Sequence, residues 1–65
     1  EVRTAFEAVS ELSPRLRETI VAVDVMGLSY KEAARALQVR KGTIMSRLHR
    51  ARDAVADALD PGGES

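Results

Sequence analysis

The sequence predicts an all-α fold, a small four-helix domain that ends in a helix-turn-helix and has no winged elements. Apolar residues recur at the three- and four-residue spacing of helices, and no segment shows the alternation typical of a strand. Gly and Pro divide this pattern into short segments. With 65 residues, the chain is long enough for one domain with a thin hydrophobic core.

Two helices are predicted before the helix-turn-helix. The first covers about residues 2–12, and Phe6 is expected to face the core. Ser13 then serves as the N-cap of a second helix over residues 14–26, which has Pro at its first position. Gly27 ends this helix because Gly readily adopts the left-handed conformation of a C-cap.

The helix-turn-helix begins with a third helix over residues 29–37. Ser29 and Glu32 have the spacing of a capping box, in which each side chain accepts a hydrogen bond from the other residue's backbone N–H. Residues 38–40 form the turn, and the fourth helix covers residues 41–59.

The fourth helix is predicted to be amphipathic. Its inward stripe consists of Ile44, Leu48, Ala51, Val55 and Leu59. The opposite side is small and polar in the first half and acidic in the second half. A Pro-Gly-Gly run stops the helix, so we expect a domain over residues 1–60 and a flexible tail over residues 61–65.

The net charge of zero hides an uneven distribution of charge. Residues 38–52 carry five positive side chains and no acidic one. The rest of the chain holds the other five positive and all ten negative charges, a balance of −5. This asymmetry is typical of a protein that binds nucleic acid, although a solvated charged helix face would look similar.

Composition excludes several other classes of function. The chain has no Cys, which rules out disulfides and thiolate sites and fits a cytoplasmic protein. No apolar run approaches the ~20 residues of a membrane span, so no membrane partner is expected. His49 is the only histidine, and no catalytic constellation is visible, so we expect no metal, no cofactor and no enzyme. Because the chain does not start with Met, we interpret it as a fragment of a longer protein.

Most of the chain resembles a known family. The run LSYKEAARALQVRKGTIMSRLHRARDAV is similar to region 4 of bacterial sigma-70-type factors, in particular the extracytoplasmic-function (ECF) group. The preceding LSPRLRETIVAVDVMGLSYKEAA resembles that group's Leu-x-Pro turn, hydrophobic helix and Gly-hydrophobic-Ser/Thr-Tyr pattern. GTIMSRLHRAR is the most specific part, and the resemblance covers about residues 1–59.

The resemblance implies binding of the promoter −35 element in the major groove, within RNA polymerase holoenzyme. It also implies docking on the flap of the polymerase β subunit and, as in many members, control by an anti-sigma factor. By position, the expected contacts to DNA bases are Met45, Ser46, His49 and Arg50. The expected contacts to phosphates are Lys31, Arg40, Lys41, Thr43 and Arg47.

The sequence departs from the family pattern at two positions. Met45 stands where the family often has Lys or Arg, so a contact to a thymine methyl or plain packing would replace a basic contact. Gln38 stands where the turn often has Gly, and a positive φ at this residue would cost roughly 1 kcal/mol. Either the turn is slightly altered or Gln38 bears the strain.

Several alternatives remain open from the sequence. The DNA-binding domain of a LuxR-type response regulator shares some of the motifs, and a purely protein-binding helical module is a third class. An apolar cluster that contains Val21, Val25 and Met26 is either core or a docking patch for a protein partner. Arg47 binds a phosphate or forms an ion pair with Glu18 or Glu32. Further expectations are that Tyr30 packs near the helix-turn-helix entrance and that Arg52 belongs to an ion pair or the surface.

Overall fold

The computed structural model describes residues 3–60 of the chain, and every regular element in that range is helical. The predicted tail over residues 61–65 lies outside the described residues. The elements in chain order are α1 (Ala5–Ser10), α2 (Pro14–Ile20), the π-helix η1 (Val21–Val25), α3 (Tyr30–Leu37) and α4 (Lys41–Leu59). The predicted all-α class and the C-terminal helix-turn-helix are therefore confirmed. No helix in this range is both long enough and apolar enough to cross a membrane.

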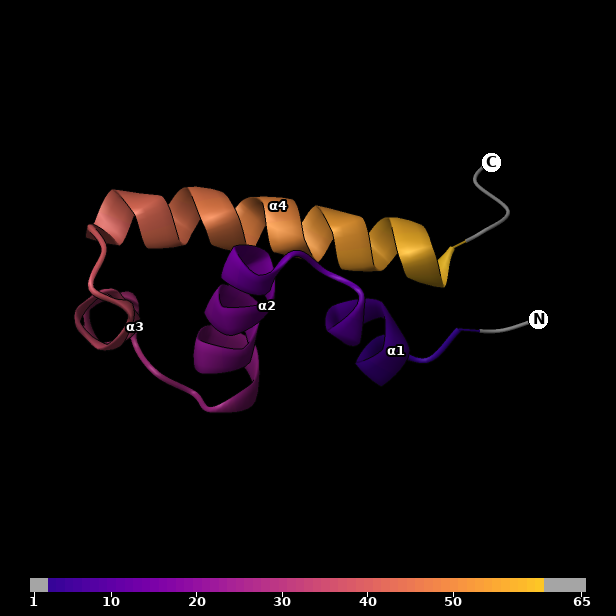
Figure 1. Cartoon of the computed structure of the whole chain (residues 1–65), viewed down its shortest axis with the longest axis horizontal. Helices are drawn as coiled ribbons and strands as arrows, with labels where there is room; N and C mark the ends of the chain where they lie inside the picture. Colours follow the sequence, from indigo (N-terminus) through magenta and orange to yellow (C-terminus); the bar gives the residue numbers. More distant parts are fainter. Residues whose placement is uncertain (1–2, 61–65) are drawn as a thin grey trace.

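The long helix α4 organises the domain. It runs along one whole side of the molecule, and α1, α2 and α3 all lie against the same side of α4 (Figure 1). The resulting body measures 38 × 19 × 18 Å. Because α3 and the first half of α4 are joined by a short turn at one end, that end is the helix-turn-helix.

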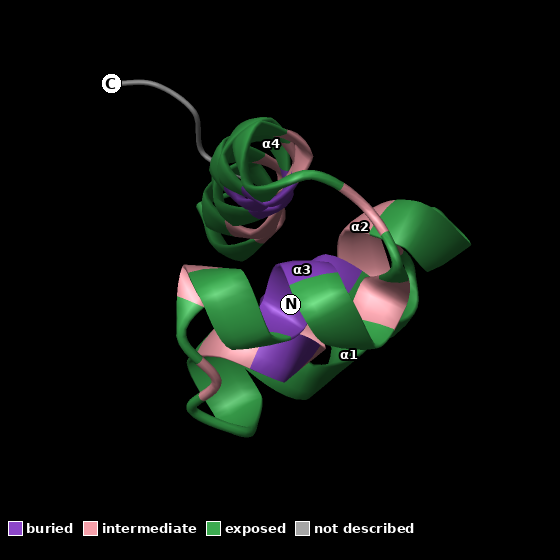
Figure 2. Ribbon diagram, turned by 90° about the vertical axis from the view of Figure 1, so that its left-hand side faces the viewer, coloured by how far each residue is buried: buried purple, intermediate pink, exposed green. Residues whose placement is uncertain are grey.

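The hydrophobic core lies between α4 and the shorter helices. Ile44, Leu48 and Ala51 are at most 2% exposed, and they occupy the side of α4 that faces α2 and α3 (Figure 2). Ile44 packs with α3 and η1, whereas Leu48 and Ala51 pack with Ile20 of α2. The predicted inward stripe is correct over these positions, but it is wrong at Leu59, which is 40% exposed because the shorter helices do not cover the end of α4.

The start and the end of α3 follow the predicted chemistry. Ser29 Oγ accepts from the Glu32 N–H at 3.0 Å, and Glu32 Oε1 accepts from the Ser29 N–H at 2.8 Å, which is the predicted capping box. Gln38 has φ 59° and ψ 45°, so this non-Gly residue takes the left-handed conformation that the turn requires. The Val39 N–H donates to the Ala34 carbonyl at 3.0 Å and closes the helix end.

The second predicted helix contains a wider π turn. The Met26 N–H donates to the Val21 carbonyl, five residues back, at 2.9 Å. A π turn accommodates an extra residue and shifts the helical phase of the residues that follow. Gly27 then ends the segment with φ 78°, as predicted.

The prediction for the first helix was wrong in two respects. Within the described residues α1 is short, Ala5–Ser10, because Thr4 and Glu7 form a capping box that starts it at this point. Phe6 is 82% exposed and is not part of the core. Ala8 is the buried residue of α1, and a residue two positions earlier lies on the opposite side of a helix.

We predict that Ile44→Ala and Leu48→Ala each lower the free energy of unfolding by about 2–5 kcal/mol, because each leaves a cavity in the core. Thermal melts followed by circular dichroism measure the loss. Met45→Ala is the matched control, since Met45 lies on the same helix and is 51% exposed. Equal melting temperatures for the core variants and the parent would show that the rotation of α4 is assigned wrongly.

Candidate nucleic-acid interface

The residues predicted to contact bases lie together on the first half of α4. Met45, Ser46, His49 and Arg50 are all exposed, while the neighbouring core residues Ile44 and Leu48 are buried. The Ser46 hydroxyl donates to the Thr43 carbonyl at 3.3 Å, a bond that leaves its oxygen able to accept. These side chains form an outward face that a partner could approach.

The backbone at the start of α4 is open to an approaching partner. Arg40 occupies the N-cap position of this 19-residue helix without a side-chain cap bond. The Thr43 N–H donates to the Arg40 carbonyl at 3.0 Å, whereas the N–H groups of Lys41 and Gly42 have no such partner among the described residues. A Cβ atom built on Gly42 would meet nothing within 4 Å, so no internal packing requires Gly at this position. Such a helix start carries a partial positive charge and suits a phosphate group.

The residues predicted to contact phosphates surround this helix start. Lys31, Arg40 and Lys41 are exposed, and Thr43 and Arg47 are half-buried. Arg47 forms no ion pair with Glu18, Glu32 or any other acidic group of residues 3–60, so the ion-pair alternative for Arg47 is wrong.

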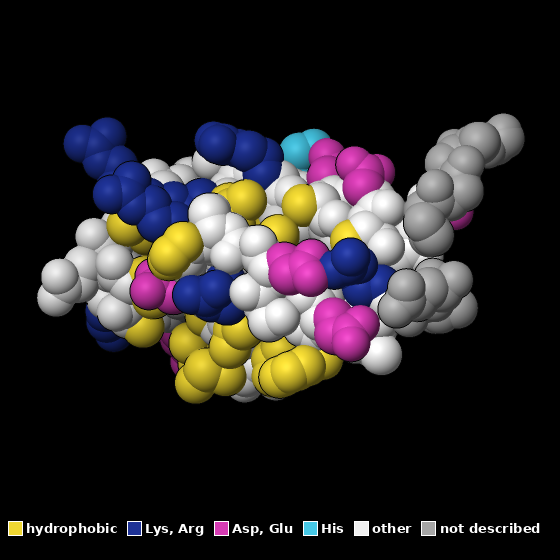
Figure 3. All heavy atoms as spheres, turned by 45° about the vertical axis from the view of Figure 1, so that its right-hand side comes forward, with side chains coloured by type: hydrophobic (Ala, Val, Ile, Leu, Met, Phe, Trp, Pro, Cys, Tyr) yellow, Lys and Arg dark blue, Asp and Glu magenta, His cyan; other side chains and the backbone are white. Residues whose placement is uncertain are grey.

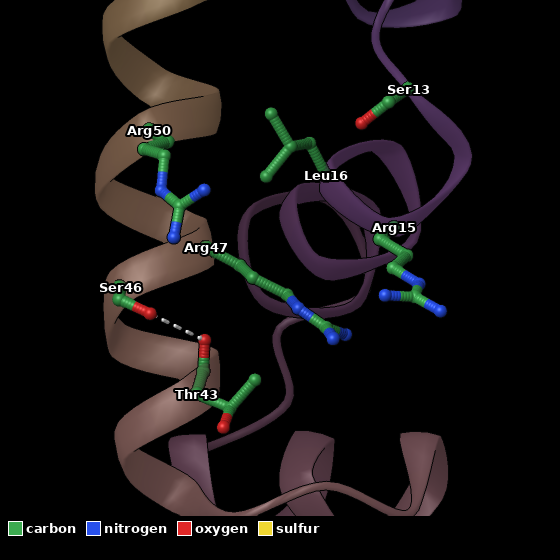
Figure 4. A pocket seen from close by; sticks show the side chains of 7 residues that line it. All are labelled: Ser13, Arg15, Leu16, Thr43, Ser46, Arg47 and Arg50. Carbon is green, nitrogen blue, oxygen red and sulfur yellow. Dashed lines mark hydrogen bonds between the residues drawn. The ribbon is translucent and has the colours of Figure 1, made fainter.

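A shallow pocket of about 430 Å³ lies on the flank of α4, next to the start of α2 (Figure 4). On the α4 side it is lined by Thr43, Ser46, Arg47 and Arg50. The α2 side contributes Ser13, Arg15 and Leu16, none of which the sequence analysis assigned to the site. Helical periodicity cannot find such residues, because their place depends on how α2 packs on α4.

Charge divides α4 into two halves. Lys and Arg side chains gather at one end of the α4 side of the molecule, and His49 is followed by acidic groups farther along it (Figure 3). His49 Nε2 lies 3.4 Å from Asp53 Oδ2, and both side chains are well exposed. Residues 3–60 contain no cluster of His and acidic side chains that could hold a metal ion. A polyanion would therefore be attracted to the first half of α4 and repelled from the second.

Arg52 belongs to a different environment from the other arginines of α4. Its guanidinium donates two hydrogen bonds to the Asp24 carboxylate, at 3.0 and 2.6 Å, and so ties α4 to η1. The expected intramolecular pair is confirmed. The hydrogen bonds and the charge of Arg52 lower the pKa of Asp24, against a smaller opposing effect of burial.

The apolar cluster that the sequence left unassigned is largely on the surface. Val25 is 71% and Met26 is 66% exposed, whereas Val21 is half-buried and contacts the core. Hydrophobic side chains also gather at the edge of the molecule that lies away from α4 (Figure 3). Tyr30 is half-buried and packs against the buried residues around Ile44 and those around Leu48, as predicted.

The fold and this surface together define a helix-turn-helix protein. The second helix of its helix-turn-helix, α4, is basic in its first half. A family model described as "Sigma-70, region 4" matches residues 3–55, and the chain belongs to this family of transcription-initiation domains. No solved structure gives a significant match.

The curated relatives are bacterial sigma factors. The chain is 42% identical over 52 residues to the ECF RNA polymerase sigma factor SigE of Mycolicibacterium smegmatis, a match that covers 80% of the chain and 20% of the relative. It is 36% identical over 58 residues to the RNA polymerase sigma-H factor of Pseudomonas aeruginosa, covering 89% and 30%. It is also 36% identical over 56 residues to the ECF RNA polymerase sigma-E factor of Escherichia coli K12, covering 86% and 29%. The chain thus spans less than a third of the length of these relatives.

The Asp24–Arg52 pair predicts a pH dependence of stability. Since folding lowers the pKa of Asp24, the pair stabilises the fold at neutral pH. This contribution falls as the pH drops below the usual aspartate pKa of about 3.9 and through the lowered value. We expect Asp24→Asn to cost less than about 1 kcal/mol at neutral pH, because the pair is partly exposed, and to cost nothing in strong acid.

Thermal melts of parent and variant across this pH range measure the difference. Asp57→Asn is the control, because Asp57 is exposed and its side chain has no ion pair among residues 3–60. A cost of Asp24→Asn that stays constant from neutral to acid pH would show that the pair does not contribute through its charge.

Proposed function

We propose that this chain binds the −35 element of promoters in duplex DNA, within RNA polymerase holoenzyme, and so directs transcription initiation. The observation that carries the proposal is the division of α4. Its first half presents exposed polar and basic side chains beside an uncapped helix start, and its second half is acidic. An α-helix fits the major groove, where base edges present distinct donor and acceptor patterns.

The proposed contacts to bases are Met45, Ser46, His49 and Arg50, which share the exposed face of α4. Arg50 has the planar fork that binds the O6 and N7 atoms of guanine. Ser46 offers a hydroxyl to a base edge or a phosphate. Met45 is 51% exposed and offers an apolar contact to a thymine methyl group.

The proposed contacts to phosphates are Lys31, Arg40, Lys41, Thr43 and Arg47, together with the N-terminal N–H groups of α4. These contacts would fix the position of α4 in the groove without selecting a sequence. Gly42 supports the proposal, because the lack of a side chain lets the backbone approach the duplex closely.

The protein partners are proposed from the family and from the apolar patch of Val21, Val25 and Met26, in which Val25 and Met26 are exposed and Val21 is half-buried. We assign this patch to docking on the RNA polymerase core, at the flap of the β subunit. An anti-sigma factor would act by covering the patch or the basic half of α4. This function involves no cofactor and no catalysis, and it takes place in the cytoplasm.

The two alternatives receive less support. A LuxR-type response regulator does not account for a match to sigma-70 region 4 over residues 3–55. The basic side chains around the start of α4 have no acidic partners among the described residues. A purely protein-binding module would not explain this unpaired positive charge. Salt-dependent binding to DNA separates that class from the proposed function.

We predict that Arg50→Ala weakens binding to the selected −35 sequence by about 1–3 kcal/mol and relaxes base preference, because a bidentate contact to guanine is lost. The site is first selected by the parent from a random pool of duplexes, and binding of the variants is then measured by fluorescence anisotropy. Arg50→Lys should keep the affinity for random duplexes but lose part of the base preference, since Lys lacks the fork.

Arg52→Ala is the matched control for Arg50→Ala. It removes the same side chain from the same helix, but Arg52 is bonded to Asp24 and should not affect base preference. If Arg50→Ala weakens binding to selected and random duplexes equally, Arg50 contacts the phosphates and not a base.

We also predict that Met26→Asp lowers the affinity for RNA polymerase core at least severalfold and leaves helical circular dichroism unchanged. Met26 is 66% exposed, so a carboxylate at this position can be hydrated in the free protein but not in an apolar interface. Ala56→Asp on the exposed side of α4 is the control. If Met26→Asp stays folded and binds polymerase like the parent, the docking surface lies elsewhere.

A further inference from the structure

The pocket between α2 and α4 concentrates positive charge that nothing in the described chain neutralises. Arg15 belongs to α2, and Arg47 and Arg50 belong to α4. In Figure 4 the side chain of Arg47 extends from α4 toward Arg15. No acidic residue lines the pocket, and none of these arginines forms an ion pair within residues 3–60. The like charges of Arg47 and Arg15 repel each other, and a bound anion would lower that repulsion.

We propose that this pocket binds a backbone phosphate of the duplex through Arg15 and Arg47, and that Arg15 is a further DNA-binding residue outside the helix-turn-helix. Arg50 also lines the pocket but keeps the base contact proposed above. The inference rests on the proposed function, since it requires the first half of α4 to lie in the groove. The guanidinium group is well matched to phosphate, because its planar N–H groups can bind two phosphate oxygens at once.

Hydroxyl groups complete the set of donors. Ser13 occupies the N-cap position of α2, yet its side chain makes no cap hydrogen bond. Neither the Ser13 nor the Thr43 hydroxyl donates a hydrogen bond to another group of the described chain. Both are therefore free to donate to an anion in the pocket, beside the arginines.

The location of the pocket fits the edge of a major groove. A helix with its side chains is roughly 10–12 Å across and nearly fills a groove about 12 Å wide, so its flanks lie beside the phosphate backbones. Thr43 and Arg47 share one flank of α4, because they are four residues apart. The start of α2 lies against that flank, which places Arg15 over the same rim.

The neighbouring Arg17 shows that the arginines of α2 have different roles. Its guanidinium donates to the Ser10 carbonyl at 3.1 Å and to the Leu12 carbonyl at 3.2 Å, so Arg17 closes the loop between α1 and α2. Arg15 makes no such side-chain bond to the described residues and lies in the pocket. Arg15 is thus the arginine of α2 that is available to DNA.

The test is a salt titration of binding to random-sequence and parent-selected duplexes. Each phosphate contact contributes close to one unit to the log–log slope of affinity against salt. We expect Arg15→Ala to reduce the slope by about one unit and to weaken binding to both kinds of duplex by the same factor. Arg15→Lys should keep most of the slope. Arg15→Gln provides a second neutral variant if Arg15→Ala lowers helical circular dichroism.

Arg3→Ala controls for the change in net charge, because Arg3 precedes α1 and pairs with Glu11 outside the pocket. Equal slopes for Arg3→Ala and Arg15→Ala would overturn the assignment of the pocket. An unchanged slope for Arg15→Ala, with a reduced slope for Lys41→Ala, would overturn it and leave the proposed function intact. Binding of inorganic phosphate that depends on Arg15, with an unchanged DNA slope, would show a site for a free anion and also overturn it. A parent whose binding to DNA does not depend on salt would overturn both proposals.

Discussion

The packing of Ile44, Leu48 and Ala51 against α2, α3 and η1 is the constraint on which the rest of the structure depends. In a domain of this size the same helix supplies core residues on one side and the outward surface on the other. Because these residues are at most 2% exposed, α4 cannot rotate about its axis without placing apolar side chains in water. The core therefore determines which side chains α4 presents outward, and a partner of α4 would meet a preorganised face.

The charged side chains distinguish the two ends of this face of α4. Arg52 is held by Asp24, so the positive charges that remain without partners on α4 lie nearer its start, with Arg15 of α2 beside them. Acidic side chains follow from Asp53 onward. A duplex would therefore be held at one end of α4 and kept away from the other, while the exposed Val25 and Met26 remain available to a protein partner.

Local signals in the sequence predict the helix-turn-helix well. The Ser29–Glu32 capping box and the buried Ile44, Leu48 and Ala51 of α4 follow from short-range spacing, whereas Leu59 does not. The left-handed Gln38 was raised only by the resemblance to a turn that often has Gly. The exposure of Phe6 was not predicted, although the Thr4–Glu7 spacing could have indicated where α1 starts. The π turn was not predicted. The place of Arg15 beside α4 depends on packing between helices, which the periodicity of a single helix does not reveal. The contacts assigned to individual bases and phosphates remain predictions.

The orientation proposed for the domain places the first half of α4, with the start of α2, against DNA. Titration of a parent-selected duplex into the isotope-labelled protein, followed through the backbone amides by NMR, tests this orientation. We expect the shift changes to concentrate on the start of α4, from Arg40 to Arg50, and around Arg15, while Asp53 to Leu59 and η1 change little. Changes centred on η1 or on the acidic half of α4 would contradict it.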